Sequence, residues 1–249
     1  MRLEGKVAII TGGAQGIGEA YSVGMAREGA IVFIADVDEN SGAKLVERIK
    51  NEGGSASFIR TDVSIKAETE ALVQKVVSEY GRIDVLINNA AIVDITPIEK
   101  ISEEMWDKLY AINVKGVFFC SQAVARIMVR QKSGKIINIS SIAAVGAQPG
   151  LCVYSSTKGA VLTMTKVFAL ELCDSNIQVN AILPGTISTG MAKQAMMDPE
   201  WTKQVVQGIP MKRLGKTEDL LGAVLYFASD DSNYCTGQTL IVDGGVSMI

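Results

Sequence analysis

Short apolar runs rich in β-branched residues alternate with amphipathic segments along the whole chain. A short apolar run bounded by turn residues is typical of a buried strand, whereas apolar residues that recur every three or four positions indicate a helix. Seven strands are predicted on this basis, at 7–10, 31–35, 57–61, 84–88, 135–140, 177–183 and 239–242. Helices are predicted between them, at 19–28, 40–52, 66–80, 103–130, 153–173 and 217–229.

The alternation itself predicts how these elements are arranged. Strands that alternate with helical segments form a parallel sheet joined by right-handed crossovers. Several strands, such as 85–87, are apolar throughout, which is typical of a sheet with helices on both faces. No linker, repeat or low-complexity stretch divides the chain. We therefore predict one α/β domain over 1–249, built on a doubly wound, seven-stranded parallel sheet.

A glycine-rich turn, Thr11-Gly12-Gly13-Ala14-Gln15-Gly16-Ile17-Gly18, joins the first strand to the first helix. Glycines there permit a tight turn and close approach to a pyrophosphate, and the helix N-terminus offers free N–H groups to that anion. Asp36 ends the second strand, about 20 residues on, where an acidic side chain can bind both ribose hydroxyls of NAD. The sequence therefore predicts a Rossmann fold that binds NAD.

Polar or glycine-containing segments also follow the later strands. They are Asp62-Val63, Asn88-Asn89-Ala90-Ala91, Ser140-Ser141 and 184–189. Taken singly, each could be ordinary turn chemistry. Ligands of a doubly wound sheet bind beyond the carboxyl ends of its strands, so we expect these segments to gather around one site.

The chain contains no histidine, the usual acid/base near neutral pH. Tyr154 and Lys158 stand four residues apart in a predicted helix and would share one face of it. Their reference pKa values of about 10 and 10.4 are far from neutral. A lysine ammonium beside a phenol favours the phenolate, so we expect Lys158 to lower the pKa of Tyr154, as would a positively charged cofactor.

Composition excludes several classes of protein. The net charge is -3 and no basic stripe is present, so we expect no nucleic-acid partner. The four cysteines form no CxxC motif and there is no histidine, so we expect no metal site and no Ser-His-Asp or Cys-His hydrolase. We also expect no signal peptide, because the first strand begins close to Met1, and no membrane span. These observations favour a soluble, cytoplasmic protein.

Over essentially its whole length the chain resembles the short-chain dehydrogenase/reductase family. The resemblance is carried by the glycine-rich turn, Asn88-Asn89-Ala90-Ala91, Asn113, Ser141, Tyr154-x3-Lys158 and Pro184-Gly185, in the order and spacing of the family. The Asn-Asn-Ala motif usually ends in glycine, where this chain has Ala91.

The resemblance implies catalytic roles. Tyr154 would exchange a proton with the substrate oxygen, and Lys158 would lower its pKa and bind the nicotinamide ribose. Ser141 would hydrogen-bond the substrate oxygen, with Ser140 as the second choice. Asn113 would hold a water that links Lys158 to solvent.

The resemblance also implies a cofactor site. The residues expected to contact NAD are Gly12, Gln15, Gly16, Ile17, Gly18, Asp36, Asp62, Val63, Asn89, Ala90, Tyr154, Lys158, Gly185, Ile187 and Thr189. Gln15 and Ile17 would line the phosphate turn and Asp62 and Val63 the adenine. Ile187 and Thr189 would hold the carboxamide.

The substrate is expected to be a mostly apolar secondary alcohol or ketone. The loops 92–95 and 142–152 would form the walls of its site, with Ser141, Gln148, Leu151 and Tyr154 in contact with it, and 186–216 a lid. The methionines of that lid, Met191, Met196, Met197 and Met211, are either an adaptable substrate surface or core. These walls carry no arginine, which disfavours an anionic substrate.

Three alternatives remain open. A 3-oxoacyl-(acyl carrier protein) reductase shares every motif, although such relatives prefer NADP and often have a basic residue where this chain has Ser175. A sugar or polyol dehydrogenase is the second. A non-catalytic nucleotide sensor is the third, but such relatives usually lack the tyrosine or the lysine. Relatives are usually tetramers, assembled through the helices 103–130 and 153–173 and the last strand, so we expect a homotetramer.

Overall fold

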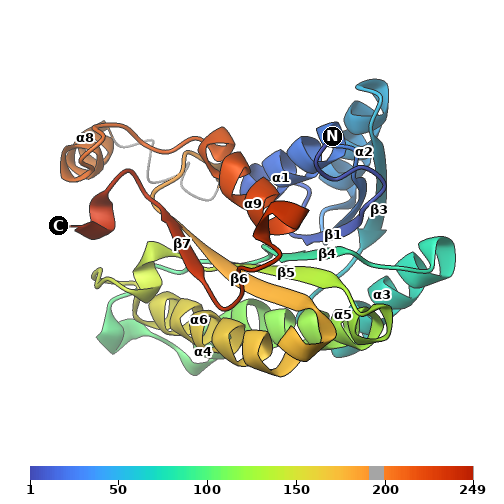
Figure 1. The fold of residues 1–249 in the computed structure, drawn as a ribbon. Coiled ribbons are helices and arrows are strands. Elements are labelled where there is room, and N and C mark those ends of the chain that lie inside the picture. Colours follow the sequence, from blue (N-terminus) through green and yellow to red (C-terminus); the bar gives the residue numbers. More distant parts are fainter. Residues whose placement is uncertain (191–198, 249) are drawn as a thin grey trace.

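The computed structural model in Figure 1 describes residues 1–190 and 199–248. A single sheet of seven parallel strands lies at its centre, in the order β3-β2-β1-β4-β5-β6-β7. The strands are β1 (Val7–Thr11), β2 (Ile31–Asp36), β3 (Ser55–Arg60), β4 (Val85–Asn88), β5 (Gly134–Ile139), β6 (Ile177–Pro184) and β7 (Thr239–Val242). The order reverses between β1 and β4, which is the switch point where doubly wound sheets bind ligands.

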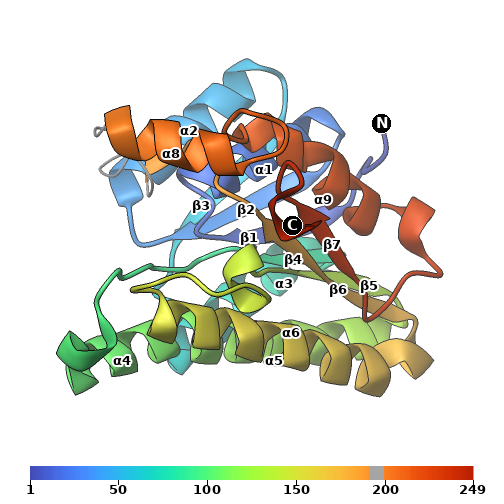
Figure 2. The same cartoon turned by 90° about the vertical axis from the view of Figure 1, so that its left-hand side faces the viewer.

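Helices cover both faces of the sheet, as Figures 1 and 2 show. One face carries α1 (Gly16–Arg27), α2 (Glu39–Asn51) and α9 (Leu221–Ala228). The other carries α3 (Lys66–Tyr80), α5 (Val117–Gln131) and α6 (Cys152–Leu172). The remaining helices are α4 (Glu103–Tyr110) and α8 (Pro199–Gly208). Short 3-10 turns lie at Ile98–Lys100, Ile142–Ala144, Cys173–Ser175, Thr217–Leu220, Asp230–Ser232 and Val246–Met248.

Neighbouring residues of each central strand enter two different cores. In β1, Ala8 and Ile10 pack under α1 and α9, whereas Val7 and Ile9 pack under α3 and α5. Successive side chains of a strand point to opposite faces, so a strand that is apolar at every position fills both layers. This is why the uninterrupted apolar runs correctly predicted a sheet covered on both sides.

The strands confirm the prediction to within a few residues, and three helical segments differ from it. The predicted helix 103–130 is interrupted by a π-helical segment, Ala111–Gly116, between α4 and α5. The predicted helix 217–229 begins as a 3-10 turn. Helix α8 lies inside the predicted lid 186–216, and Met191, Met196 and Met197 of that lid fall outside the described residues.

The continuous helical stretch Glu103–Gln131 has the length and apolar composition of a membrane-crossing helix. Core helices of water-soluble folds share both properties. Here Cys120, Val124 and Met128 of this stretch lie in the core beneath the sheet. The packing of these residues into the core accounts for part of the apolar composition of this stretch.

Candidate active site

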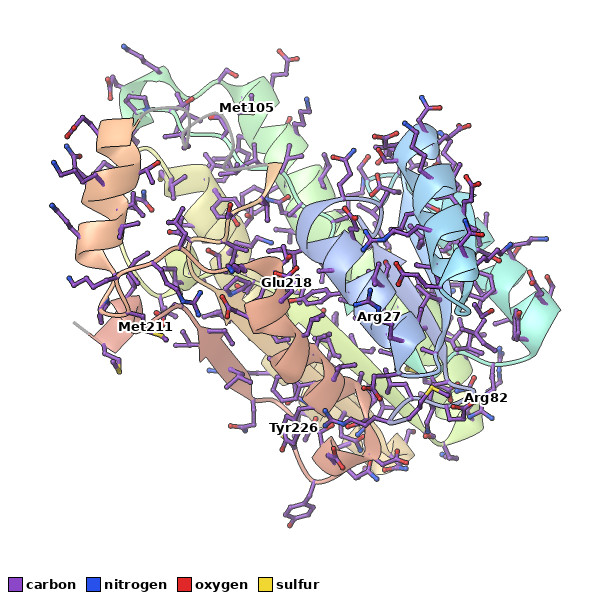
Figure 3. The ribbon with its side chains drawn as sticks, turned by 90° about the horizontal axis from the view of Figure 1, so that it is seen from above. Arg27, Arg82, Met105, Met211, Glu218 and Tyr226 are labelled. Carbon is purple, nitrogen blue, oxygen red and sulfur yellow. The ribbon has the colours of Figure 1, made fainter. Side chains whose placement is uncertain are left out.

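The segments that follow the strands meet at one end of the sheet. Thr11 of β1 pairs with Asn88 of β4, which in turn pairs with Asn138 of β5. The backbone N–H of Ser140 then donates to the carbonyl of Ile182 in β6. Seen from above in Figure 3, Met105 and Met211 mark this end of the molecule, and Arg82 and Tyr226 mark the opposite end.

The glycine-rich turn is packed so closely that side chains are excluded from it. Gly12 and Gly16 have φ angles of 60° and 57°, in the left-handed region that favours glycine. A Cβ atom on Gly12 would lie 2.7 Å from Cα of Ala90, and one on Gly18 would overlap the carbonyl oxygen of Gly12. The turn therefore leaves its backbone open, beside the unpaired N–H groups of the first turn of α1. Such a cradle fits a dinucleotide pyrophosphate.

The loop after β4 is tied to this turn through Thr11. Its hydroxyl accepts hydrogen bonds from the backbone N–H groups of Asn89 (3.1 Å) and Ala90 (3.2 Å). The Asn89 amide donates to the carbonyls of Thr11 (3.1 Å) and Gly12 (2.9 Å). Ala91 does not adopt a positive φ, so the alanine that replaces the usual glycine causes no backbone strain. The sequence placed Thr11 in the glycine-rich turn without indicating the role of its hydroxyl, although its position at the end of β1 was a signal.

Asp36 is held between the glycine-rich turn and the start of α2. Its Oδ2 accepts from the N–H of Ala14 at 3.1 Å, and its Oδ1 accepts from the N–H of Asp38 at 3.1 Å. The facing residue of β3 is Arg60, the cation that could have attracted a phosphate to this site. Arg60 instead pairs with Glu68 at 2.9 Å and with Glu39 at 3.9 Å.

Several other predicted cofactor residues also lie at this rim, but the side chains of some of them are bonded within the protein or buried in its core. The Asp62 carboxylate accepts from the N–H (2.9 Å) and the hydroxyl (2.6 Å) of Ser64, and the Val63 side chain is buried in the core. Ile187 is also buried. Thr189 lies beside the glycine-rich turn: a Cβ atom placed on Gly16 would be 3.6 Å from the Cβ atom of Thr189.

Gly185 must be small for the loop after β6 to pass the end of β7. A Cβ atom at this position would lie 2.7 Å from Cα of Asp243. The N–H of Gly185 donates to the carbonyl of Val242 at 3.0 Å. The loop is thereby held at the same edge as the turns after β1 and β4.

Tyr154 and Lys158 lie on one face of α6, with Nζ of Lys158 over the phenol ring, 5.7 Å from its centroid. Lys158 is 3% exposed, and burial lowers its pKa to about 8. Its ammonium donates to the carbonyl of Ile139 at 2.9 Å. Burial also raises the pKa of Tyr154, and the hydrogen bond with Ser141 offsets part of that rise. The net shift of the pKa of Tyr154 in this structure is therefore upward, because burial disfavours the phenolate, and the lowering effect expected of Lys158 stays a prediction.

The two serines after β5 have different partners. The Ser140 hydroxyl is buried and donates to the carbonyl of Lys158 at 2.9 Å, so its proton is committed. The Ser141 hydroxyl interacts with Tyr154 and accepts from the N–H of Ala143 at 3.1 Å. Ser141 is thus the serine that shares a site with the phenol.

Asn113 lies in the π-helical segment, a type of helix distortion that is frequent at functional sites. Its side chain is fully buried and bridges two elements. Oδ1 accepts from the N–H of Ile92 at 2.9 Å, and Nδ2 donates to the carbonyl of Ile92 (2.9 Å) and to the hydroxyl of Thr157 (3.1 Å). Thr157 donates to the carbonyl of Tyr154 at 2.6 Å. Asn113 therefore joins the loop after β4 to the helix of Tyr154, and Thr157 is a second residue that the sequence analysis missed.

The two predicted substrate walls touch one another. The N–H of Thr96 donates to the carbonyl of Gly150 at 2.9 Å, and a Cβ atom on Gly150 would lie 2.9 Å from the Ile95 side chain. Gln148 is exposed, whereas Leu151 is buried at the start of α6. Of the two predicted wall contacts, only Gln148 has a freely accessible side chain.

Sequence comparison agrees with this geometry. A family profile described as enoyl-(acyl carrier protein) reductase matches residues 12–247. The chain is 40% identical to a 3-oxoacyl-(acyl-carrier-protein) reductase of Thermotoga maritima over 99% of both chains, and 36% identical to a cyclopentanol dehydrogenase of Comamonas sp. over 98% of both. The chain belongs to the short-chain dehydrogenase/reductase family. It is an oxidoreductase of that family, whose members use nicotinamide cofactors.

Solved structures of this family share the whole fold. A gluconate 5-dehydrogenase from Burkholderia cenocepacia J2315, in complex with NADP and tartrate, superposes with a TM-score of 0.96 at 36% identity, over 100% of this chain and 97% of that one. The seven-stranded Rossmann fold predicted from the sequence is thereby confirmed.

Proposed function

We propose that this short-chain dehydrogenase/reductase interconverts a mostly apolar secondary alcohol and its ketone with NAD, and that Tyr154 is the acid/base. The observation that carries the proposal is the joint placement of Tyr154, Lys158 and Ser141 at the rim that also holds the glycine-rich cradle. When bound, the nicotinamide accepts or donates the hydride.

The residues of this chain would handle the proton. The hydroxyl proton of the alcohol passes to Oη of Tyr154, and in the reverse reaction it returns to the carbonyl oxygen. Ser141 donates a hydrogen bond to the same substrate oxygen, where negative charge develops. The ammonium of Lys158, fixed by the carbonyl of Ile139, favours the phenolate once the site carries further positive charge. Asn113 and Thr157 hold the helix of Tyr154 in register with the loop after β4.

The preference for NAD is supported by Asp36 and by the pairing of Arg60. Like charges repel, so a carboxylate at the ribose disfavours a 2′-phosphate and accepts hydrogen bonds from a free 2′-hydroxyl. Arg60 is already paired with Glu68 and Glu39. NADP is the alternative, because the gluconate 5-dehydrogenase structure contains it.

The substrate class is supported by the exposed side chains of the walls. Ile95 and Val145 present apolar surface to solvent in loops that contact each other or adjoin Ser141. A 3-oxoacyl thioester and a sugar or polyol are the alternative substrates, since the chain is 40% identical to a relative named for the first and 36% identical to one named for a sugar acid. NAD reduction measured with cyclic and linear secondary alcohols, polyols and sugar acids, together with NADH oxidation by a 3-oxoacyl thioester, separates the three. If the highest kcat/KM were found for a polyol, a sugar acid or the thioester, the proposal of an apolar alcohol substrate would be contradicted.

We also propose a cytoplasmic homotetramer. Phe118, Val167 and Leu170 expose apolar surface on α5 and α6, beside a hollow of about 520 Å³ between these helices. Leu240 and Ile241 expose a second apolar surface on β7. A mass from solution scattering near that of one chain would contradict the tetramer.

The cytoplasmic location is supported by the cysteines, all four of which are free, as is usual in a reducing compartment.

A further inference from the structure

A second carboxylate lies beside Asp36. Asp38 is the N-cap of α2, and its Oδ1 accepts from the N–H of Ser41 at 3.0 Å. Its Oδ2 accepts from the Ser41 hydroxyl at 2.8 Å and from the Gln15 amide at 2.6 Å. These hydrogen bonds, led by the backbone N–H of Ser41, hold the pKa of Asp38 below its usual range. Asp38 is therefore ionised at neutral pH.

Gln15 joins this carboxylate to the glycine-rich turn. It is the N-cap residue of α1, yet its side chain makes no capping bond there. Its amide instead reaches Asp38 and, at 3.2 Å, the hydroxyl of Ser41. The neighbouring N–H of Ala14 and the N–H of Asp38 both donate to Asp36. Asp36 and Asp38 thus belong to one hydrogen-bonded unit that spans the turn and the end of β2.

The same unit uses groups that an extra phosphate would need. Free N–H groups at the start of a helix are common phosphate ligands. At the start of α2, the N–H of Ser41 is already bonded to Asp38. The nearby guanidinium of Arg60 is likewise paired with Glu68 and Glu39.

We propose that Asp38, held by Gln15, is a second specificity-determining residue that excludes a phosphate from the 2′-oxygen of the adenosine ribose. The inference rests on the proposed dinucleotide function and adds a residue to it. The charge of Asp38 repels a phosphate, and this is the effect that the variants below remove. The hydrogen bond from the N–H of Ser41 also occupies a donor that could bind a phosphate, and an asparagine or serine N-cap would keep that bond.

The test measures binding of NAD and NADP by calorimetry in the absence of substrate, because the two differ only in the 2′-phosphate. Asp38→Asn removes the negative charge and keeps a good N-cap residue. Asp38→Ser also removes the charge, and its hydroxyl oxygen can cap the helix in place of the carboxylate. Glu47→Gln is the matched control: it removes one negative charge from an exposed position further along α2. Thermal unfolding of each variant verifies that it is folded.

We expect both Asp38 variants to lower the ratio of the Kd for NADP to the Kd for NAD by about tenfold, with the Kd for NAD changed by less than about threefold. Glu47→Gln should leave the ratio unchanged. A ratio within about twofold of wild type in both Asp38 variants would overturn the proposal, as would an equal fall in Glu47→Gln. Failure of the wild type to bind either dinucleotide would instead refute the cofactor function itself.

Discussion

Nζ of Lys158 lies over the ring of Tyr154, 5.7 Å from its centroid, but its hydrogen bond goes to the carbonyl of Ile139. Burial lowers the pKa of Lys158 and raises that of Tyr154, so it favours the uncharged form of each residue. Burial therefore disfavours the phenolate in this structure, and additional positive charge beside the phenol would favour it. An oxidised nicotinamide carries such a charge, which would couple activation of Tyr154 to cofactor binding.

Replacing Tyr154 with phenylalanine should abolish most turnover and preserve the fold and NAD affinity, because the change removes only the hydroxyl. General acid–base catalysis contributes about 10²–10⁴-fold to the rate, so we expect kcat to decrease by a factor within that range. Steady-state kinetics and calorimetric NAD binding check the two parts. If the variant kept more than about a tenth of wild-type kcat, another group would have to be the acid/base.

The cofactor preference should be large in the wild type and reversible at two positions. We expect kcat/KM with NAD to exceed that with NADP by at least about 100-fold, or ~2.7 kcal/mol. Asp36→Ala combined with Val37→Arg should shift this ratio toward NADP. The double variant removes the carboxylate and places a cation beside its position, because Val37 is exposed and next to Asp36 in the sequence. Saturation curves for both cofactors with one substrate decide this. Equal efficiency in the wild type, or a double variant that does not shift, contradicts the argument.

Gly18→Ala should weaken dinucleotide binding and destabilise the fold. A Cβ atom at this position overlaps the carbonyl of Gly12 and would lie 2.7 Å from the Asn89 amide, so the cradle must open. Gly222→Ala is the matched control: that glycine is also in the first turn of a helix, and a Cβ atom there meets no heavy atom within 4 Å. It should be neutral or stabilise by about 0.5–1 kcal/mol. Similar melting temperatures and NAD affinities for the two variants would show that the close packing of the turn is unimportant.

Lys135 predicts a pH dependence of stability that is separate from catalysis. It is buried at the amino end of β5 and donates to Asn233 (2.8 Å) and Ser232 (3.2 Å), and burial lowers its pKa from 10.5 to about 8. Above pH 8 the unfolded chain binds a proton that the folded lysine has lost, so this residue's contribution makes the protein more stable as pH rises from 8 toward 10.5.

The difference in unfolding free energy between wild type and Lys135→Met isolates this contribution. It should change in favour of the wild type between about pH 7.5 and 9.5, by at most ~1.4 kcal/mol per pH unit. Denaturant unfolding at several pH values measures it. A difference that is constant over this interval would mean that the pKa of the folded lysine is not lowered.

Much of the site could be predicted because its motifs are local. Strand ends in a parallel sheet meet at one edge, so Asn89, Ser141 and Gly185 could be assigned to one rim from their positions alone. The π-helical segment around Asn113 was not predicted, since its pattern of apolar residues is the same as that of an α-helix. Nor could the side-chain partners of Asn113 be predicted, because Ile92 and Thr157 are brought to it only by folding.

The sequence by itself determined the sheet, the glycine cradle and the Tyr154–Lys158 pair, because hydrophobic period, glycine spacing and helical pitch are properties of neighbouring residues. Only the tertiary structure decided which way the pKa of Tyr154 shifts, that Arg60 is paired with Glu68, and that Asp38 is bound by Gln15. Burial depends on the whole fold, and the Gln15–Asp38 contact joins residues 23 positions apart. Proximity along the chain therefore indicated which groups are candidates for the chemistry, and the shifts in their pKa values followed from the packing around them.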